Sequence, residues 1–235
     1  MSQLTAEEKK QSDDAIAFIK KHQKAFLDKF AGSAFYVADA APVSLFMAGS
    51  PGAGKTETSK RLIETFSNKP VRIDADEIRE FLPGYNGTNA YIFQRAADKG
   101  INILLDHTLA NNINFILDAT FAYGGYEENV ARCLNHKRKV VIYYIFQEPK
   151  KAWEMVIARE AIEHRRVSKD VFVSAFLAAR NNVNMIKHKF GSKIELNIII
   201  KNFDTGEDKI ELGISTVDDY LPKAYTQDEL NIITL

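Results

Sequence analysis

Short apolar runs alternate with longer segments of helical periodicity along most of the chain. Apolar runs of this length are typical of strands buried on both faces of a sheet, and they occupy residues 43–48, 71–74, 113–118, 140–146 and 194–200. Helical periodicity fills the intervals at residues 56–66, 88–110, 124–136 and 150–189. The last of these helical regions is expected to break near residues 167–168. Strands that alternate with helices predict an α/β fold, with a mainly parallel five-stranded sheet and helices on both faces.

The two ends of the chain extend this pattern. Residues 5–30 are predicted to be helical, because Thr5 and Glu8 have the spacing of a capping box and apolar side chains recur near one face. We expect this segment, within residues 1–40, to pack on the sheet. A turn at residues 204–207 predicts a hairpin and then a short terminal helix. No stretch has the composition of a linker, so the whole chain is expected to form one domain.

Composition narrows the classes of function. The 235 residues are 46% hydrophobic and 26% charged, which is typical of a globular domain. Lys plus Arg and Asp plus Glu both number 31, so nothing indicates a basic nucleic-acid-binding protein. The single cysteine, Cys133, favours a reducing compartment. No apolar stretch approaches the ~20 residues of a membrane span, and the N-terminus does not resemble a signal peptide, so we expect a cytoplasmic protein.

The strongest chemical signal is the sequence Gly-Ser-Pro-Gly-Ala-Gly-Lys-Thr at residues 49–56. It matches the phosphate-binding P-loop and stands between a predicted strand and a predicted helix, as that motif requires. Its glycines allow a tight turn that gathers backbone N–H groups, and the helix N-terminus adds positive potential. Lys55 is expected to reach the β- and γ-phosphates of a nucleoside triphosphate, and Thr56 to hold Mg²⁺. The predicted ATP-binding residues are Gly49, Ser50, Pro51, Gly52, Ala53, Gly54, Lys55, Thr56 and Glu57.

Acidic residues follow the second and third predicted strands. Ligands of parallel sheets lie at the carboxyl ends of the strands, so Asp74, Asp76 and Asp118 are expected near the γ-phosphate. Transfer of a phosphoryl group to a hydroxyl needs a proton acceptor and acids that hold Mg²⁺. Asp118 has the context of a Walker-B-type metal ligand, and Asp76 or Asp74 is the candidate base. Alternatively, Asp74 or Asp76 caps a helix that begins at Glu77.

Arginines cluster on the helix after the fourth predicted strand. Arg159 and Arg166 are separated by nearly two helical turns, which predicts one shared face, whereas Arg165 points elsewhere. Two guanidinium groups on a helical lid over residues 150–190 would suit the charge on a transferring phosphoryl group. The alternative is a solvated basic face that pairs with neighbouring glutamates.

Together these motifs resemble the zeta toxin family of P-loop kinases, from about residue 43 to about residue 200. The resemblance rests on the P-loop, the Asp-x-Asp segment that closes with Leu-Pro-Gly-Tyr at residues 82–85, the sequence at residues 116–120, and the arginines. It implies an ATP-dependent kinase that phosphorylates the 3′-hydroxyl of a UDP-N-acetyl amino sugar, UDP-N-acetylglucosamine, giving a product that poisons peptidoglycan synthesis. It also implies a protein partner, an antitoxin that blocks the nucleotide site.

The resemblance also assigns roles to individual residues. Asp76 matches the catalytic base of the family and Lys55 its P-loop lysine. Arg159 and Arg166 match two lid arginines near the transferred phosphate. The predicted acceptor-binding residues are Asp74, Arg79, Asp118 and Thr120.

Two departures from the family concern the acceptor pocket. Asp118 and Ala119 stand where the family usually has Glu and Gly, and an acidic residue expected on the preceding helix falls at Asn102. These changes leave open another acceptor, such as a different nucleotide, a sugar, an antibiotic or a nucleic-acid 5′-hydroxyl. A further alternative is a nucleotide-binding interaction module without catalysis, against which the presence of Lys55, Thr56, Asp76 and Asp118 counts.

Overall fold

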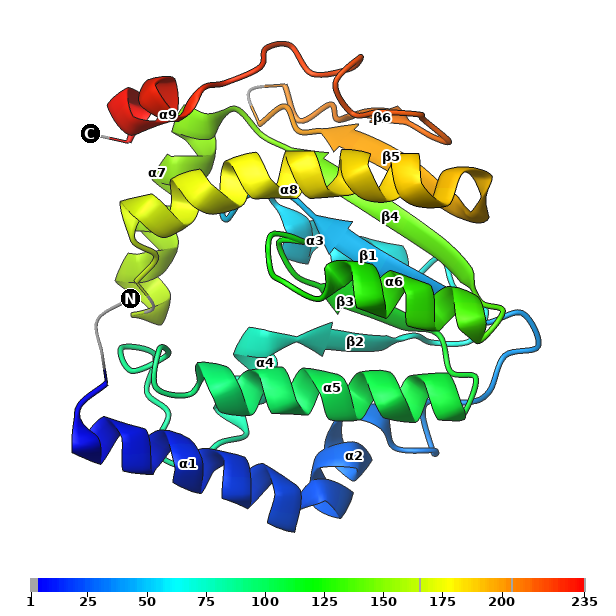
Figure 1. Cartoon of the computed structure of the whole chain (residues 1–235), viewed down its shortest axis with the longest axis vertical. Helices are drawn as coiled ribbons and strands as arrows, with labels where there is room; N and C mark the ends of the chain where they lie inside the picture. The colour runs from blue at the N-terminus through cyan, green and yellow to red at the C-terminus, as the bar shows by residue number, and fades with distance from the viewer. Residues whose placement is uncertain (1–3, 165, 204, 235) are drawn as a thin grey trace.

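The structure is a computed structural model of the chain and describes residues 4–164, 166–203 and 205–234. In this part of the chain, six strands form one sheet in the order β2-β3-β1-β4-β5-β6 (Figure 1). Neighbouring strands from β2 to β5 are parallel, which confirms the predicted α/β class. The strands are β1 Val43–Ala48, β2 Val71–Asp74, β3 Phe115–Asp118, β4 Lys139–Phe146, β5 Ile194–Ile200 and β6 Lys209–Glu211.

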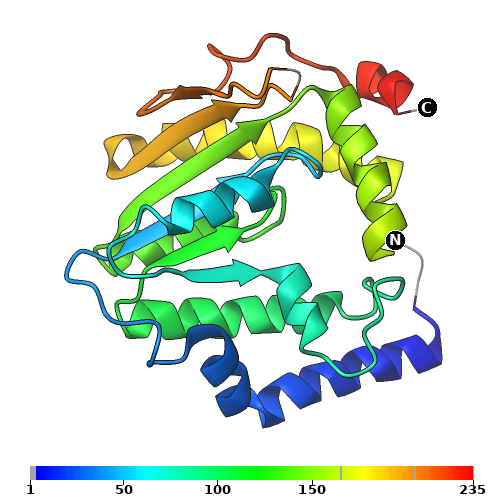
Figure 2. The same cartoon turned by 180° about the vertical axis from the view of Figure 1, so that it is seen from behind.

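Helices cover both faces of this sheet. α5, α6 and α8 lie on the face toward the viewer in Figure 1, and α3 lies on the opposite face, seen in Figure 2. Phe46 of β1 faces one apolar core, and its neighbours Leu45 and Met47 face the other, as expected for a strand buried on both sides. The helices are α1 Ala6–Lys21, α2 Gln23–Ala31, α3 Lys55–Ile63, α4 Ala75–Glu80, α5 Gln94–Ala110, α6 Tyr126–Asn135, α7 Pro149–Glu163, α8 Lys169–Phe190 and α9 Gln227–Ile233, with a 3₁₀ turn at Gly191–Lys193.

The sheet has one strand more than the predicted five. β6 pairs with β5 in antiparallel register, with Ile210 opposite Ile199, so the hairpin predicted after β5 adds a short edge strand. Charged residues, Lys209 and Glu211, make up most of β6, and its apolar signal is therefore too weak to predict a strand of the sheet. The turn predicted next to it includes Asp204, which lies outside the described residues. α9 confirms the predicted terminal helix.

The N-terminal helical segment consists of two helices. Its predicted capping box forms, because the Thr5 hydroxyl accepts the Glu8 N–H at 3.2 Å and the Glu8 carboxylate accepts the Thr5 N–H at 2.7 Å. His22 separates α1 from α2. α1 packs on α5, whereas α2 reaches β2. The expectation that this segment packs on the sheet is therefore wrong for α1, because α5 already covers β2 at that edge. None of the helices in the described residues is long and apolar enough to cross a membrane.

Arg138 ties the amino ends of the strands together, at the end of the sheet opposite to the P-loop. Its side chain is buried, and burial lowers the pKa of its guanidinium group. Nε donates to the Ser44 hydroxyl at 2.6 Å, and Nη2 donates to the carbonyl oxygens of Val43 at 3.0 Å and Ile113 at 2.7 Å. These acceptors compensate for the lost hydration, so Arg138 stabilises the fold far from the strand ends where a ligand is expected.

Candidate functional site

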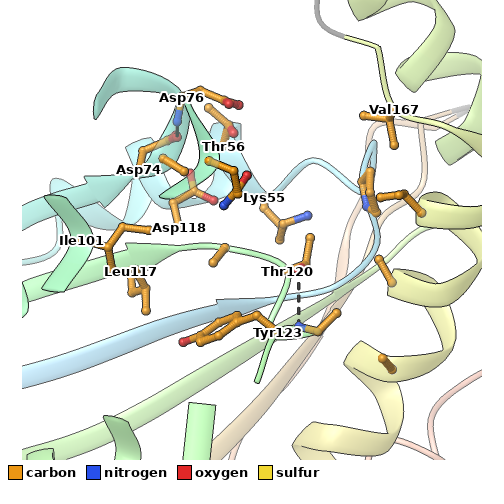
Figure 3. Close-up of a pocket in the computed structure, with 18 of the residues that line it drawn as sticks. Lys55, Thr56, Asp74, Asp76, Ile101, Leu117, Asp118, Thr120, Tyr123 and Val167 are labelled. Carbon is orange, nitrogen blue, oxygen red and sulfur yellow. Dashed lines mark hydrogen bonds between the residues drawn. The ribbon is translucent and has the colours of Figure 1, made fainter. Parts of the chain in front are cut away.

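A large cavity opens at the carboxyl ends of the strands, as the sheet topology predicts. Its volume is about 1210 Å³, and its walls come from the P-loop, α4, α5, the segment after β3, and the lid helices α7 and α8 (Figure 3). The predicted site residues that line it are Pro51, Gly52, Gly54, Lys55, Thr56, Glu57, Asp74, Asp76, Arg79, Asp118, Thr120 and Arg159. Gly49, Ser50 and Ala53 complete the loop behind this wall, and Ser50 and Ala53 are buried.

The P-loop has the conformation that its motif requires. Gly49 and Gly52 have φ values of 134° and 74°, which glycine adopts without a steric penalty. A Cβ atom on Gly52 would lie 2.0 Å from the carbonyl oxygen of Ala152. Lys55 begins α3, and its Nζ donates to the carbonyl oxygens of Gly49 at 3.1 Å and Ser50 at 2.7 Å. The loop and the helix N-terminus thus form a cradle that suits phosphate groups.

We expect the substitution Gly52→Ala to destabilise the protein by roughly 2–4 kcal/mol, because the new methyl group combines overpacking with a strained φ. Gly213 provides a matched control, since its φ is 66° and a Cβ there would meet no atom within 4 Å. Gly213→Ala should cost only the strain of the left-handed backbone, roughly 1–2 kcal/mol. Urea denaturation of both variants measures the two losses, and equal losses would show that the approach to Ala152 is unimportant.

Two carboxylates meet at the ends of neighbouring strands. Asp74 and Asp118 are register partners in the β2–β3 pair. Asp74 Oδ1 also accepts the backbone N–H of Asp76 at 2.7 Å, so Asp74 is the N-cap of α4. The Asp74 side chain therefore caps a helix, as the alternative prediction stated. The predicted helix start at Glu77 is wrong, because this cap lets α4 begin at Ala75.

Arg72 organises these acids, although no motif of the sequence includes it. It lies in the middle of β2, and its guanidinium group contacts Asp74, Asp118 and Glu77. Burial opposes ionisation, but the three carboxylates raise the pKa of Arg72 overall. The available signal was a charged residue inside a run predicted to be buried, since buried charges are paired in folded proteins.

Burial raises the pKa of Asp74 to about 6, and the nearby charge of Asp118 acts in the same direction, while Arg72 opposes both. The ordinary value is 3.8. The native state therefore holds the Asp74 proton more tightly than the unfolded chain does. The protonated Asp74 carboxyl group contributes to stability fully below about pH 4, and this contribution is lost as the pH rises through about 6.

We expect the stability difference between the wild type and Asp74→Asn to change with pH. From pH 4 to pH 7 the wild type should lose about 3 kcal/mol relative to the variant, since about two pKa units of linkage disappear with the carboxyl group. Urea denaturation at a series of pH values, without nucleotide or metal, measures this difference. A difference that stays constant over this range would contradict the raised pKa.

A chain of hydrogen bonds supports Asp76 from α5. Arg79 Nη1 donates to Asp76 Oδ1 at 2.6 Å, and Nη2 donates to the Gln94 side chain. Gln94 Nε2 donates to Asp98 Oδ1 at 2.8 Å. Arg79 was predicted to bind the acceptor, and its guanidinium group is engaged by Asp76 and Gln94. Asp98 lies one helical turn before Asn102, and both line the cavity. This wall therefore has an acidic residue, although the position where the family's acid was expected is Asn102.

The lid has the predicted break but not the predicted arginine pair. Ser168 caps α8, and Arg159 of α7 lines the cavity. Arg166 lies between the two helices and is exposed. The predicted shared face is wrong, because α7 ends before Arg166 and His164 has a left-handed φ of 56°. Arg165 lies outside the described residues.

The segment after β3 closes the site between the acids and the lid. The Thr120 carbonyl oxygen accepts the N–H of Gly49 at 3.1 Å, and the Thr120 hydroxyl accepts the N–H of Ala122 at 3.3 Å (Figure 3). Burial raises the pKa of Tyr123 to about 12, so its phenol is neutral at pH 7. One wall of the cavity is apolar and consists of Ile101, Leu117, Ala122, Tyr123, Met155, Val156, Val167 and Val171. The sequence does not predict this wall, because apolar residues usually indicate core packing.

The fold and the site define a P-loop kinase fold, with the glycine loop after β1 and an aspartate at the end of the adjacent β3. The family model for the zeta toxin matches residues 28–208. The chain therefore belongs to the zeta toxin family, which confirms the resemblance drawn from its motifs. No curated protein matches the sequence significantly.

Solved structures share this fold at low sequence identity. A structure from the PezAT chromosomal toxin–antitoxin system of Streptococcus pneumoniae is 15% identical with a TM-score of 0.61, covering 99% of this chain and 89% of that chain. The AvrRxo1-ORF1:ORF2 complex is 16% identical with a TM-score of 0.61, covering 86% and 70%. The same complex with ATP is 13% identical with a TM-score of 0.59, covering 91% and 70%.

Proposed function

We propose that the protein is an ATP-dependent phosphotransferase that phosphorylates the hydroxyl group of a small molecule. The observation that carries this proposal is that the P-loop and Asp76 line the same cavity. A phosphate donor and a proton acceptor in one cavity meet the needs of phosphoryl transfer. Membership of the zeta toxin family and the likeness to a structure solved with ATP support the same reaction.

The donor half of the site suits ATP and Mg²⁺. The glycine cradle leaves no room for a Cβ atom beside Ala152. Lys55 Nζ contacts the carbonyl oxygens of Gly49 and Ser50 in the loop, and it would bind the β- and γ-phosphates there. Thr56 and Asp118 would hold Mg²⁺, because a hydroxyl and a carboxylate are hard oxygen ligands and phosphate oxygens supply others. When bound, the metal would neutralise charge that develops on the transferring group.

The acceptor half would supply the base. Asp76 takes the proton of the acceptor hydroxyl while the oxygen of that hydroxyl forms a bond to the γ-phosphorus of ATP. The bond from the γ-phosphorus to the oxygen that bridges it to the β-phosphate breaks, and ADP leaves. Arg79 orients the Asp76 carboxylate through Oδ1. Arg159 on the lid would stabilise the charge of the transferring phosphoryl group. Arg166 is proposed as a second arginine for the same phosphoryl group, because the family resemblance assigns it that role.

The acceptor that the family implies is a UDP-N-acetyl amino sugar, with UDP-N-acetylglucosamine first and its 3′-hydroxyl as the reacting group. The carboxylate of Asp98 beside Asn102 supports a polar acceptor, because carboxylates accept hydrogen bonds from sugar hydroxyls. The phosphorylated product would interfere with bacterial cell-wall synthesis, and we expect a cytoplasmic enzyme. A protein partner, an antitoxin, is proposed because the similar structures include a toxin–antitoxin system.

One observation favours a different acceptor as the second candidate. The Asp118 carboxylate accepts from Arg72 Nη2 at 2.7 Å and from the Ser59 hydroxyl at 2.8 Å. Its Oδ2 is therefore held toward the sheet and α3, whereas the longer Glu of the family's motif would extend further into the pocket. A pocket changed at this point would suit another nucleotide, a sugar or an antibiotic.

An ATP-consumption assay with a panel of UDP-sugars tests the proposal and ranks the acceptors. We expect ATP to be consumed faster with UDP-N-acetylglucosamine than with UDP-glucose. We also expect growth arrest when the protein is expressed in bacteria. Consumption with sugars or antibiotics alone would favour the second candidate. Tight ATP binding without transfer to any acceptor would overturn both candidates and favour a non-catalytic interaction module.

A further inference from the structure

Arg72 contacts groups on every element that carries a proposed catalytic acid or a metal ligand. Its side chain is 8% exposed. Nε donates to the Ser59 hydroxyl on α3 at 3.1 Å, and Nη2 donates to Asp118 Oδ2 on β3 at 2.7 Å. The same guanidinium group contacts Asp74 at the end of β2 and Glu77 on α4. One buried cation thus joins the P-loop helix to both strand ends and to α4.

These contacts hold the reacting groups in two ways. Asp118 Oδ2 lies 2.8 Å from the Ser59 hydroxyl as well as 2.7 Å from Arg72, so two donors fix one oxygen of this carboxylate. Asp74 accepts from Arg72 through Oδ2 and from the N–H of Asp76 through Oδ1. Arg72 therefore reaches the backbone of Asp76 through a single intervening side chain.

We propose that Arg72 is a positioning residue for the phosphotransfer site. It holds Asp118 by Oδ2, so that Oδ1 can bind Mg²⁺, and, through Asp74, it fixes the start of α4 that carries Asp76; this inference rests on the proposed function. The planar fork of a guanidinium group serves several acceptors at fixed angles, and an ammonium group is a point charge that cannot do so. Lysine at this position would keep the charge and lose the geometry.

The variant Arg72→Lys in the full chain tests this inference. The first readout is the gain in ADP affinity on adding Mg²⁺, measured by titration with and without the metal. We expect that gain to fall about 10–100-fold, the usual effect of removing a group that orients a metal ligand. The second readout is steady-state kinetics, in which kcat should fall while KM for ATP at saturating Mg²⁺ changes little.

Arg138→Lys is the matched control, since Arg138 is also buried, directly before β4 of the same sheet, and also donates to a serine, Ser44. This control variant should lower the melting temperature. It should leave both kcat and the gain in ADP affinity on adding Mg²⁺ at wild-type values. If Arg72→Lys keeps both wild-type values, or if Arg138→Lys lowers them equally, Arg72 is a structural residue only and the inference is overturned.

Ser59→Ala provides the answer if Arg72→Lys does not fold. It removes the hydroxyl that bonds both Arg72 and Asp118, and it should also lower the Mg²⁺-dependent gain in ADP affinity; an unchanged gain would overturn the inference. The ADP titration needs no acceptor. A wild type that gains ADP affinity with Mg²⁺ but transfers no phosphate would overturn the proposed function alone, whereas a wild type without any gain would overturn the role of Arg72.

Discussion

Replacing Asp76 by asparagine is expected to lower phosphotransfer by about 10²–10⁴-fold, the range that a general base contributes. The amide oxygen of asparagine still accepts from Arg79, so the chain of hydrogen bonds to α5 persists while the proton acceptor is gone. ATP binding should stay close to the wild-type value, because the P-loop is unchanged. Transfer of labelled phosphate and equilibrium binding of ATP measure the two effects separately.

Asp13→Asn is the matched control for this substitution. Asp13 also pairs with an arginine, Arg95, but on the exposed surface of α1. Losing an exposed ion pair costs little stability, and we expect wild-type transfer. A variant Asp76→Asn with the same rate as Asp13→Asn would remove Asp76 from the role of base.

The second large effect is expected for Lys55→Met. The variant should transfer phosphate about 10²–10³-fold more slowly, because an electrostatic donor to the transferring group is lost. Methionine has a similar length and helix propensity, so α3 should persist. Circular dichroism checks the fold, and single-turnover transfer at saturating ATP measures the chemical step.

Lys60→Met on the same helix controls for the loss of a positive charge. Lys60 is exposed and does not line the cavity. Its variant should transfer phosphate at the wild-type rate. Equal losses in Lys55→Met and Lys60→Met would point to the net charge of α3 as the cause.

The apolar pattern predicts most of the fold because each parallel strand is buried on both faces. β1, β2 and β5 have the predicted bounds, since apolar runs end where turn residues begin. β6 is not predicted as part of the sheet, because its position depends on pairing with β5 and its own residues are mostly charged. The division at His22 is likewise absent from the helical periodicity, which continues through it.

The site is predictable where a motif or the sheet topology determines it. The P-loop places Lys55 and Thr56, and the ends of β2 and β3 bring Asp74 and Asp118 together in one register. Contacts between elements are not predictable in this way. Arg72 reaches α3, β3 and α4 only once the sheet is assembled.

The lid shows a second limit of reasoning from the sequence. Helical spacing predicted a shared face for Arg159 and Arg166, but the helix stops between them. The left-handed backbone of His164 is rare for a residue other than glycine, and nothing in the local sequence predicts it. The family resemblance assigns a role to Arg166, and the position of its side chain depends on how α7 and α8 are joined.

Mass spectrometry of a bacterial small-molecule extract tests the central claim, phosphotransfer from ATP, without choosing the acceptor in advance. The extract is incubated with ATP and either the wild type or Asp76→Asn. The account predicts that the wild type converts one class of hydroxyl-bearing compound to its phosphorylated form, with UDP-N-acetyl amino sugars first, and that Asp76→Asn yields almost none. An extract that stays unchanged while the wild type binds ATP tightly would contradict it.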